Sequence, residues 1–164
     1  MASPPYNILF LCTGNSARSI LAEGLVNQLS GGRFKGYSAG SQPTGQVNPF
    51  ALETLQNLGC GTAGFSSKSW DVFAAPDAPK MDFIITVCDS AAGEACPFWP
   101  GSPMTAHWGF PDPARAEGGD ETKRAVFART AQAIARRLRL FLSLPHDKLD
   151  RLSLQREVRA IGES

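Results

Sequence analysis

The chain alternates short apolar runs with longer segments in which apolar residues recur every three or four positions. Short apolar runs are typical of buried strands, and the wider spacing is typical of helices with one buried face. The short runs predict strands at about 8–11, 34–39, 82–87 and 104–108. The spaced segments predict helices at about 17–29, 48–58 and 120–142. Strands that alternate with helices in this way indicate an α/β fold with a parallel sheet.

Residues with special backbone or capping properties mark the ends of the predicted helices. Gly31-Gly32 ends the first helix and Gly59 ends the second. The second helix begins at Asn48-Pro49, because asparagine is a favourable N-cap and proline a favourable first helical residue. Asp120-Glu121 opens the long third helix. The spacing also predicts the buried faces of the first and third helices, formed by Ile20, Leu21, Leu25 and Leu29, and by Phe127, Ala131, Ile134, Leu138 and Phe141.

These elements fit a three-layer α/β/α arrangement around a central four-stranded parallel sheet. A chain of 164 residues suits one domain with its own core. We expect the core to span about residues 7–142, followed by an extension over 143–164. The apolar residues of the extension are spaced as on one short amphipathic helix, which we expect to pack against the body or to fray rather than to bind a partner: Leu149, Leu152, Leu154, Val158 and Ile161.

The amino-acid composition and net charge limit the kinds of molecule that this protein is expected to bind. Hydrophobic residues make up 43% and charged residues 19% of the chain, which is typical of a globular protein, and the net charge is +1. This charge gives no basis for nucleic acid or an acidic membrane as the main partner. Arg136, Arg137 and Arg139 are interpreted as a solvated helix face. No secretion signal and no apolar run of membrane-spanning length is evident, so we expect a cytoplasmic protein.

The cysteine spacing favours reactive or buried thiols over metal ligands. Four cysteines in a reducing compartment are poor candidates for permanent disulfides. No Cys-x2-Cys pair occurs, and Cys88 and Cys96 are eight residues apart, so no zinc pattern is present. We expect no bound metal or cofactor. Cys12 and Cys88 each follow a predicted strand, and the carboxyl ends of parallel strands share one edge of the sheet.

The sequence Cys12-Thr-Gly-Asn-Ser-Ala-Arg18-Ser19 stands between a predicted strand and a predicted helix. Its small residues allow the backbone to curl, so that the N–H groups of residues 13–17 (Thr13, Gly14, Asn15, Ser16 and Ala17) can face one oxyanion beside the helix N-terminus. Arg18 offers a planar fork for two oxygens of that anion. Such a cradle favours a thiolate, which is the nucleophilic form of cysteine. The segment therefore predicts a thiolate that attacks a bound oxyanion.

Three ordered motifs give the chain a resemblance to a known family. The loop that starts at Cys12, followed by Ala22-Glu23, resembles that of arsenate reductases built on the low-molecular-weight tyrosine phosphatase fold. The segment from Val87-Cys88-Asp89 to Cys96-Pro97 is similar to their redox segment. His107-Trp-Gly-Phe-Pro-Asp112-Pro113 is similar to their third motif. The resemblance spans about residues 7–142 and implies the flavodoxin-like topology of the low-molecular-weight phosphatases.

The resemblance implies a role for each thiol. Cys12 attacks arsenate, and Asp112 is the general acid that protonates the leaving oxygen. Cys88 then attacks Cys12, expelling arsenite and leaving a disulfide, and Cys96 attacks Cys88 in turn. An external thiol system, thioredoxin or glutathione with glutaredoxin, restores the enzyme. We expect a monomer and no bound cofactor.

Supporting residues are implied as well. Asn15 holds the loop in shape through its amide, the Ser19 hydroxyl donates to the Cys12 thiolate, and Ser38 helps to position Asn15. Some members bind potassium near the loop through an acidic residue, whereas Lys68 occupies the corresponding stretch here. Our hypothesis is that the Lys68 ammonium replaces that cation. Cys60 matches no catalytic position and is interpreted as structural.

Other functions remain open at this point. The first alternative is a low-molecular-weight protein tyrosine phosphatase that hydrolyses phosphate monoesters. Against it, Asp112-Pro113 is followed by Ala114-Arg115, where the phosphatases usually carry an aromatic residue. A non-catalytic oxyanion-binding or thiol-sensing module would need neither the acid nor the additional thiols. A flavodoxin-like flavin carrier would need no nucleophile in its loop, and is the weakest alternative.

Overall fold

A computed structural model describes residues 5–61, 64–87, 103–146 and 151–163. Cys88 and Cys96, with the predicted loop around them, lie outside the described residues. The described secondary structure comprises, in chain order, β1 (Tyr6–Leu11), α1 (Arg18–Leu29), β2 (Phe34–Ala39), α2 (Pro49–Asn57), α3 (Asp71–Ala74), β3 (Phe83–Thr86), β4 (Met104–His107), the 3-10 helix η1 (Pro113–Arg115), α5 (Asp120–Leu142) and α6 (Arg151–Ile161).

The four strands form one parallel sheet in the order β2-β1-β3-β4. The predicted parallel sheet is therefore confirmed. At its carboxyl edge, Leu11 is in register with Ala39 and with Thr86, and Thr86 is in register with His107. The segments that follow these strands consequently emerge at the same edge, which is where ligands bind in open α/β sheets.

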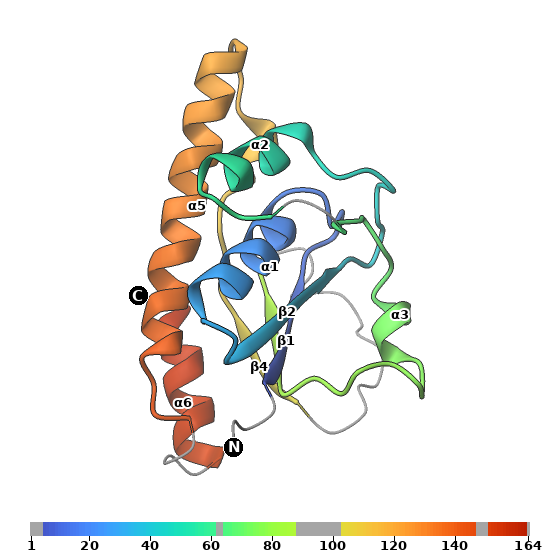
Figure 1. Cartoon of the computed structure of the whole chain (residues 1–164), viewed down its shortest axis with the longest axis vertical. Coiled ribbons are helices and arrows are strands. Elements are labelled where there is room, and N and C mark those ends of the chain that lie inside the picture. Colours follow the sequence, from blue (N-terminus) through green and yellow to red (C-terminus); the bar gives the residue numbers. More distant parts are fainter. Residues whose placement is uncertain (1–4, 62–63, 88–102, 147–150, 164) are drawn as a thin grey trace.

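Side chains of β1 alternate between two cores, as expected for a strand buried on both faces. Ile8 and Phe10 belong to the larger core, which is shared with α1 and α5. Leu9 and Leu11 belong to a smaller core on the opposite face, closed by Trp70 and by Phe73 of α3 together with Met81 and Ile84. Figure 1 shows α1 and α5 on one side of the sheet and α3 on the other. The three-layer arrangement is thus confirmed.

The helices α1 and α5 bury the faces predicted from their spacing. Ile20, Leu21 and Leu25 of α1 are buried, and Leu29 is partly buried. Because α1 lies between the sheet and the other helices, Ala22 and Val26 are buried too. All five apolar positions predicted for α5 are buried: Phe127, Ala131, Ile134, Leu138 and Phe141.

Of the two alternatives for the extension, packing holds for α6, which lies against β4 at one edge of the sheet. Leu154, Val158 and Ile161 of α6 belong to the larger core. Gln155 Nε2 donates to the Thr105 carbonyl of β4 at 2.7 Å, which satisfies a polar group on the edge of the sheet. Figure 1 shows α6 continuing beneath α5 at the end of the molecule where the chain starts.

The end of α6 lies unusually close to the end of β4. The indole N–H of Trp108 donates to the Val158 carbonyl at 3.0 Å, and both residues are fully buried. A Cβ atom on Gly162 would lie 2.1 Å from the His107 carbonyl oxygen, so only glycine fits there without a backbone shift. This contact joins the last turn of the described chain to the segment that follows β4.

Two short elements were not predicted, and one strand is longer than predicted. The helix α3 and the 3-10 helix η1 have only 4 and 3 residues, too few for an apolar spacing of three or four positions to repeat. The first strand begins at Tyr6 because the Tyr6 N–H donates to the Arg33 carbonyl at 3.0 Å and its ring stacks on Phe34.

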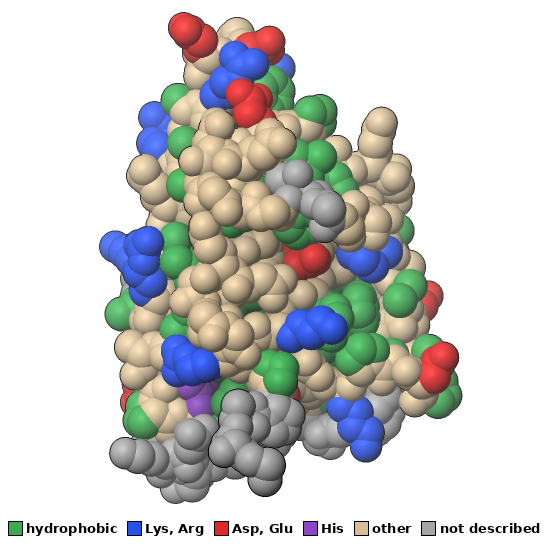
Figure 2. All heavy atoms as spheres, in the orientation of Figure 1, with side chains coloured by type: hydrophobic (Ala, Val, Ile, Leu, Met, Phe, Trp, Pro, Cys, Tyr) green, Lys and Arg blue, Asp and Glu red, His purple; other side chains and the backbone are tan. Residues whose placement is uncertain are grey.

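The surface carries charges of both signs. On the face shown in Figure 2, basic side chains are dispersed rather than gathered into one patch. Among the described residues, no helix combines the length and the apolar character needed to cross a membrane. Within the same ranges, no three His, Cys, Asp or Glu side chains form a group able to hold a metal ion.

Candidate active site

The segment from Cys12 to Arg18, named here the anion loop, links β1 to α1 at the carboxyl edge of the sheet. Cys12 lies at the base of the loop, where its N–H donates to the Ala39 carbonyl and its exposed fraction is 5%. Ala17 is the N-cap of α1 and supplies no side-chain capping bond. The first N–H groups of α1 are therefore not capped by that side chain, and they favour an anion there.

The carbonyl groups of the anion loop are bound by the segment that follows β2. Three backbone N–H groups donate to them: Gln42 to Thr13 at 2.9 Å, Thr44 to Gly14 at 3.1 Å, and Asn48 to Ser16 at 2.9 Å. The C=O and the next N–H of a peptide unit point in opposite directions. The N–H groups that follow these carbonyls therefore point away from the segment after β2, which is compatible with an anion-binding nest.

Asn15 fixes the shape of the anion loop. It is fully buried and has a φ of 46°, in the left-handed region that asparagine tolerates better than most residues. Its Nδ2 donates to Ser19 Oγ at 2.9 Å, and its Oδ1 accepts from the Lys68 N–H at 2.9 Å. Because Ser19 Oγ accepts this bond, the Ser19 hydroxyl proton is available to another acceptor.

Gly40 supports the loop in a way that sequence reasoning missed. A Cβ atom on Gly40 would lie 2.4 Å from the Thr13 oxygen and 2.5 Å from the Cys12 oxygen. Its N–H donates to the Lys68 carbonyl at 2.9 Å, and its own carbonyl accepts from the Trp70 N–H at 2.9 Å. The only signal in the sequence is a glycine directly after an apolar strand, which is also common in ordinary turns.

Lys68 and Glu23 are both hydrogen-bonded to Ser38, behind the loop. Lys68 Nζ donates to the carbonyls of Ser66 at 2.7 Å and Ser38 at 3.0 Å. The Ser38 hydroxyl donates to Glu23 Oε1 at 2.6 Å. Burial raises the pKa of Glu23, while the Ser38 hydrogen bond and the Lys68 charge oppose this change. Burial also lowers the pKa of Lys68, against the attraction of Glu23.

Ser38 relates to Asn15 less directly than the resemblance implied. The bonds of Ser38 run to Glu23 and to Lys68, and the Asn15 amide bonds Ser19 and Lys68 instead. Lys68 therefore stands between the two residues, and Ser38 contacts the support of Asn15 rather than Asn15 itself.

Asp112 lies beside the anion loop through a contact with Arg18. Arg18 Nη2 is 3.6 Å from Asp112 Oδ2, and Arg18 Nη1 donates to the Phe110 carbonyl at 2.9 Å. The Asp112 Oδ1 atom accepts from the Ala114 N–H at 3.0 Å, so Asp112 is also the N-cap of η1. Arg115 Nε lies 3.8 Å from Asp112 on the solvent side. The structure thus brings Asp112 together with Arg18 of the anion loop, while its role as general acid stays a prediction.

Arg137 is not on a solvated helix face, and this prediction is wrong. Its Nη1 donates to the Gly109 carbonyl at 3.0 Å, and its guanidinium carbon lies 4.6 Å from the centre of the Phe110 ring. Arg136 and Arg139 are exposed, as predicted. Position 137 flanks the buried stripe of α5, and the helical pattern alone does not show that the segment after β4 passes beside it.

Cys60 is held as a structural residue. It is 8% exposed, and its Sγ donates to Gln28 Oε1 at 3.2 Å. Burial raises the pKa of the Cys60 thiol, which disfavours the reactive thiolate.

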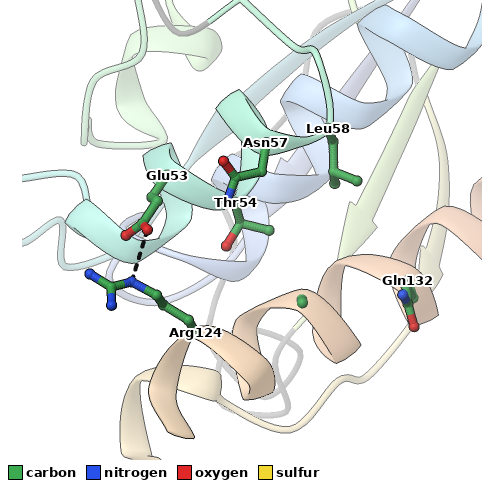
Figure 3. Close-up of a pocket in the computed structure, with 7 residues that line it drawn as sticks. Glu53, Thr54, Asn57, Leu58, Arg124 and Gln132 are labelled. Atoms are coloured by element: carbon green, nitrogen blue, oxygen red, sulfur yellow. Dashed lines mark ion pairs between the residues drawn. The ribbon is translucent and has the colours of Figure 1, made fainter. Parts of the chain in front are cut away.

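A separate pocket of about 100 Å³ lies between α2 and α5 (Figure 3). It is lined by Glu53, Thr54, Asn57, Leu58, Arg124, Ala128 and Gln132. Arg124 Nε lies 2.8 Å from Glu53 Oε1 at its rim. The lining includes no residue of the anion loop and no cysteine, so the pocket is distinct from the candidate active site.

Comparison with known proteins adds to this geometry. The family model of the low molecular weight phosphotyrosine protein phosphatases matches residues 7–159. An arsenate reductase of Halalkalibacterium halodurans is 41% identical over 134 residues, which cover 82% of this chain and 93% of that protein.

Two solved structures share the fold. The arsenate reductase of Archaeoglobus fulgidus has a TM-score of 0.59 and 27% identity, covering 80% of this chain and 98% of that one. A thioredoxin-dependent arsenate reductase of Corynebacterium glutamicum has a TM-score of 0.54 and 25% identity, and the match covers 85% of this chain and 65% of that one. The chain therefore belongs to the low molecular weight phosphotyrosine protein phosphatase family, and the relatives that it matches over most of its length include arsenate reductases.

Proposed function

We propose that this protein reduces arsenate to arsenite. One observation carries the proposal: a buried cysteine at the base of an anion loop, with Arg18 of that loop 3.6 Å from a carboxylate. A thiolate, an anion cradle and a proton donor are the groups that nucleophilic displacement at a tetrahedral oxyanion requires. Its relatives named as arsenate reductases support arsenate as that oxyanion.

The first step forms a covalent adduct on Cys12. The thiolate attacks arsenic, an S–As bond forms, and one As–O bond breaks. The departing group is an arsenate hydroxyl, which takes one proton from the protonated Asp112 carboxyl and leaves as water. The inward N–H groups of the loop and the Arg18 guanidinium hold the remaining oxygens, whose charge they stabilise.

The second step moves two electrons from sulfur to arsenic. The Cys88 thiolate attacks the Cys12 sulfur, and an S–S bond forms. The electron pair of the S–As bond remains on arsenic, which is thereby reduced from As(V) to As(III) and leaves as arsenite. Cys96 then attacks Cys88, releasing the Cys12 thiolate and leaving a Cys88–Cys96 disulfide. Both cysteines lie outside the described residues, so this step rests on the sequence motif and on the relatives.

An external dithiol completes the cycle by reducing the last disulfide. The thioredoxin dependence of the Corynebacterium glutamicum relative favours thioredoxin as that donor. Glutathione with glutaredoxin is the alternative donor. No bound cofactor takes part in this proposal.

Lys68 takes the place of a bound cation in this proposal. Its ammonium group donates to two carbonyl oxygens, those of Ser38 and Ser66, and oxygen ligands of this kind also suit a monovalent cation. Its backbone N–H holds Asn15 at the same time. Equal activity in sodium and in potassium buffers is expected, and a strong potassium requirement would refute this role.

The decisive experiment is arsenate-dependent NADPH oxidation in two coupled assays. One contains thioredoxin and its reductase, and the other contains glutathione, glutaredoxin and glutathione reductase. Turnover in either assay, absent from the Cys12→Ser variant, supports the proposal and identifies the donor. No turnover in both assays, together with rapid hydrolysis of an aryl phosphate, would favour a phosphatase instead.

Phosphatase activity is the second candidate function, because the loop and Asp112 would also serve attack on a phosphate monoester. The Cys88→Ser variant separates the two functions. A reductase loses arsenate turnover on this substitution and keeps any aryl phosphate hydrolysis. Full arsenate turnover by Cys88→Ser would contradict the thiol relay.

A further inference from the structure

We propose that Arg137 is a positioning residue for the general acid, an inference that rests on the proposed function. The relevant part of the chain is residues 108–112, named here the acid segment, which runs from the end of β4 to Asp112. Arg137 belongs to α5 and lies 25 positions after Asp112 in the sequence.

Two arginines hold consecutive carbonyls of the acid segment. Arg137 Nη1 donates to the Gly109 carbonyl at 3.0 Å, and Arg18 Nη1 donates to the Phe110 carbonyl at 2.9 Å. They come from α5 and α1, two helices that pack against each other. The backbone just before Asp112 is therefore fixed by two separate elements of the larger core.

The Phe110 ring adds a second contact with Arg137. It is 7% exposed, and its centre lies 4.6 Å from the Arg137 guanidinium carbon, within the range of a cation–π contact. One guanidinium thus holds both a carbonyl and the next side chain. A lysine could keep one of these contacts, but its ammonium lacks the planar fork that makes both.

The start of the acid segment is fixed as well. Trp108 N–H donates to the Thr86 carbonyl at 2.8 Å, and Phe110 N–H donates to the Val87 carbonyl at 3.2 Å. The acceptors of these two bonds lie at the end of β3 and directly after it, whereas Arg137 reaches the acid segment from α5. Arg137 is consequently the α5 contribution to a segment that is also held by Thr86 and Val87 on the sheet side, by Arg18 of α1 and, through Trp108, by α6.

Position matters because general acid catalysis needs hydrogen-bond reach between the carboxyl and the leaving oxygen. A displacement of about 1 Å can cost about 100-fold in rate. Asp112 follows Phe110 by two residues, so a loosened Phe110 displaces the carboxyl directly. The contacts of Arg137 with Gly109 and Phe110 lie in the acid segment, so we expect its effect on the reaction to pass chiefly through the position of the acid.

The test exploits the dependence of acid catalysis on the leaving group. A poor leaving group such as phenolate needs the proton more than p-nitrophenolate does. In Arg137→Met we expect the kcat ratio of p-nitrophenyl phosphate to phenyl phosphate to rise about tenfold. The kcat for arsenate should also fall about tenfold, with KM within about twofold, because anion binding is retained. Arg137→Lys should recover part of the loss.

Arg136→Met is the matched control, since Arg136 is the exposed neighbour on the same helix, and its kcat ratio should equal that of the unsubstituted protein. An unchanged ratio in Arg137→Met would overturn the inference, as would an equal fall with both aryl phosphates, which is the result of general loosening. Thermal unfolding of each variant shows whether a loss of activity comes from unfolding. If Arg137→Met is unfolded, the kcat ratio of Arg137→Lys decides whether the inference holds. Failure of arsenate reduction in the unsubstituted protein would refute the proposed function and leave the aryl phosphate test intact.

Discussion

Arg18 and Asp112 join the anion loop to the acid segment, with 3.6 Å between Arg18 Nη2 and Asp112 Oδ2. The side chains of Arg18 and Asp112 are 15% and 25% exposed, so the contact is largely sheltered from solvent. The same arginine holds the Phe110 carbonyl. One side chain therefore ties the segment that binds the anion to the segment that carries the candidate acid, before any substrate arrives.

Replacing Arg18 by lysine tests this connection. Lysine has one donor group in place of a fork, so it cannot hold the Phe110 carbonyl, Asp112 and an anion together. We expect kcat/KM for arsenate to fall at least about 100-fold, the loss typical of one key charge-stabilising donor. Steady-state kinetics against the unsubstituted protein measure the loss. A change below about threefold would show that Arg18 acts only as a point charge.

Gly40→Ala should damage the anion loop from behind. The added Cβ would overlap the carbonyl oxygens of Thr13 and Cys12, which are backbone atoms and cannot rotate away. We expect activity to fall at least about tenfold, because a small displacement of the cradle misplaces the reacting atoms. Gly61→Ala is the control, since no atom lies within 4 Å of its added Cβ. Equal activities in the two variants would refute the prediction.

Two substitutions of Asn15 separate the role of its backbone conformation from the role of its side-chain amide. Asn15→Ala loses two buried hydrogen bonds and places alanine at a φ of 46°, whereas Asn15→Gly loses only the bonds. We expect Asn15→Ala to lower the free energy of unfolding by about 2–4 kcal/mol, with Asn15→Gly about 1 kcal/mol less destabilised. Urea unfolding of both variants measures the difference. If glycine is the more destabilising residue, backbone strain plays no part.

Glu23 makes stability depend on pH in a predictable direction. Its folded pKa is raised above the ordinary 4.5, mainly by burial. A carboxyl group whose pKa is higher in the folded than in the unfolded protein stabilises the fold at pH values below its unfolded pKa. This stabilisation is lost as the pH rises through its folded pKa. Relative to Glu23→Gln, the unsubstituted protein should therefore gain free energy of unfolding as pH falls from 7 to about 4.5.

Urea unfolding of both proteins at several pH values in this window checks the sign. A relative loss of stability on acidification would mean that the Lys68 charge and the Ser38 hydrogen bond outweigh burial. In the Lys68→Met variant, the pKa of Glu23 should be raised further than in the unsubstituted protein, because the Lys68 charge that opposes the rise is gone.

The sequence predicts those parts of the molecule in which a residue's neighbours along the chain decide its role. The anion loop is predictable because Cys12 to Arg18 stand together between a strand and a helix. The Asn48 cap is predictable for the same reason, and its side chain accepts from the Phe50 N–H at 2.9 Å. The long face of α5 follows from a repeat sustained over 23 residues.

What escaped prediction depends on residues that meet across the fold. Gly40 is required because Thr13 lies against it, and Arg137 has a role because Gly109 passes α5. Ser38 acts through Lys68 for the same reason. Arg136 and Arg137 are identical in type and adjacent in sequence, so only a three-dimensional arrangement distinguishes an exposed side chain from one that holds the acid segment.

The contact between Trp108 and Val158 has a consequence for the order in which the protein matures during synthesis. The anion loop precedes Val158 and Gly162 in the chain, so it leaves the ribosome before them and can form with β1 and β2 while they are still to be added. A nascent chain can therefore capture an oxyanion before the segment that carries its proton donor is anchored. Under the proposed function, the candidate acid would gain its full support only after α6 has been synthesised.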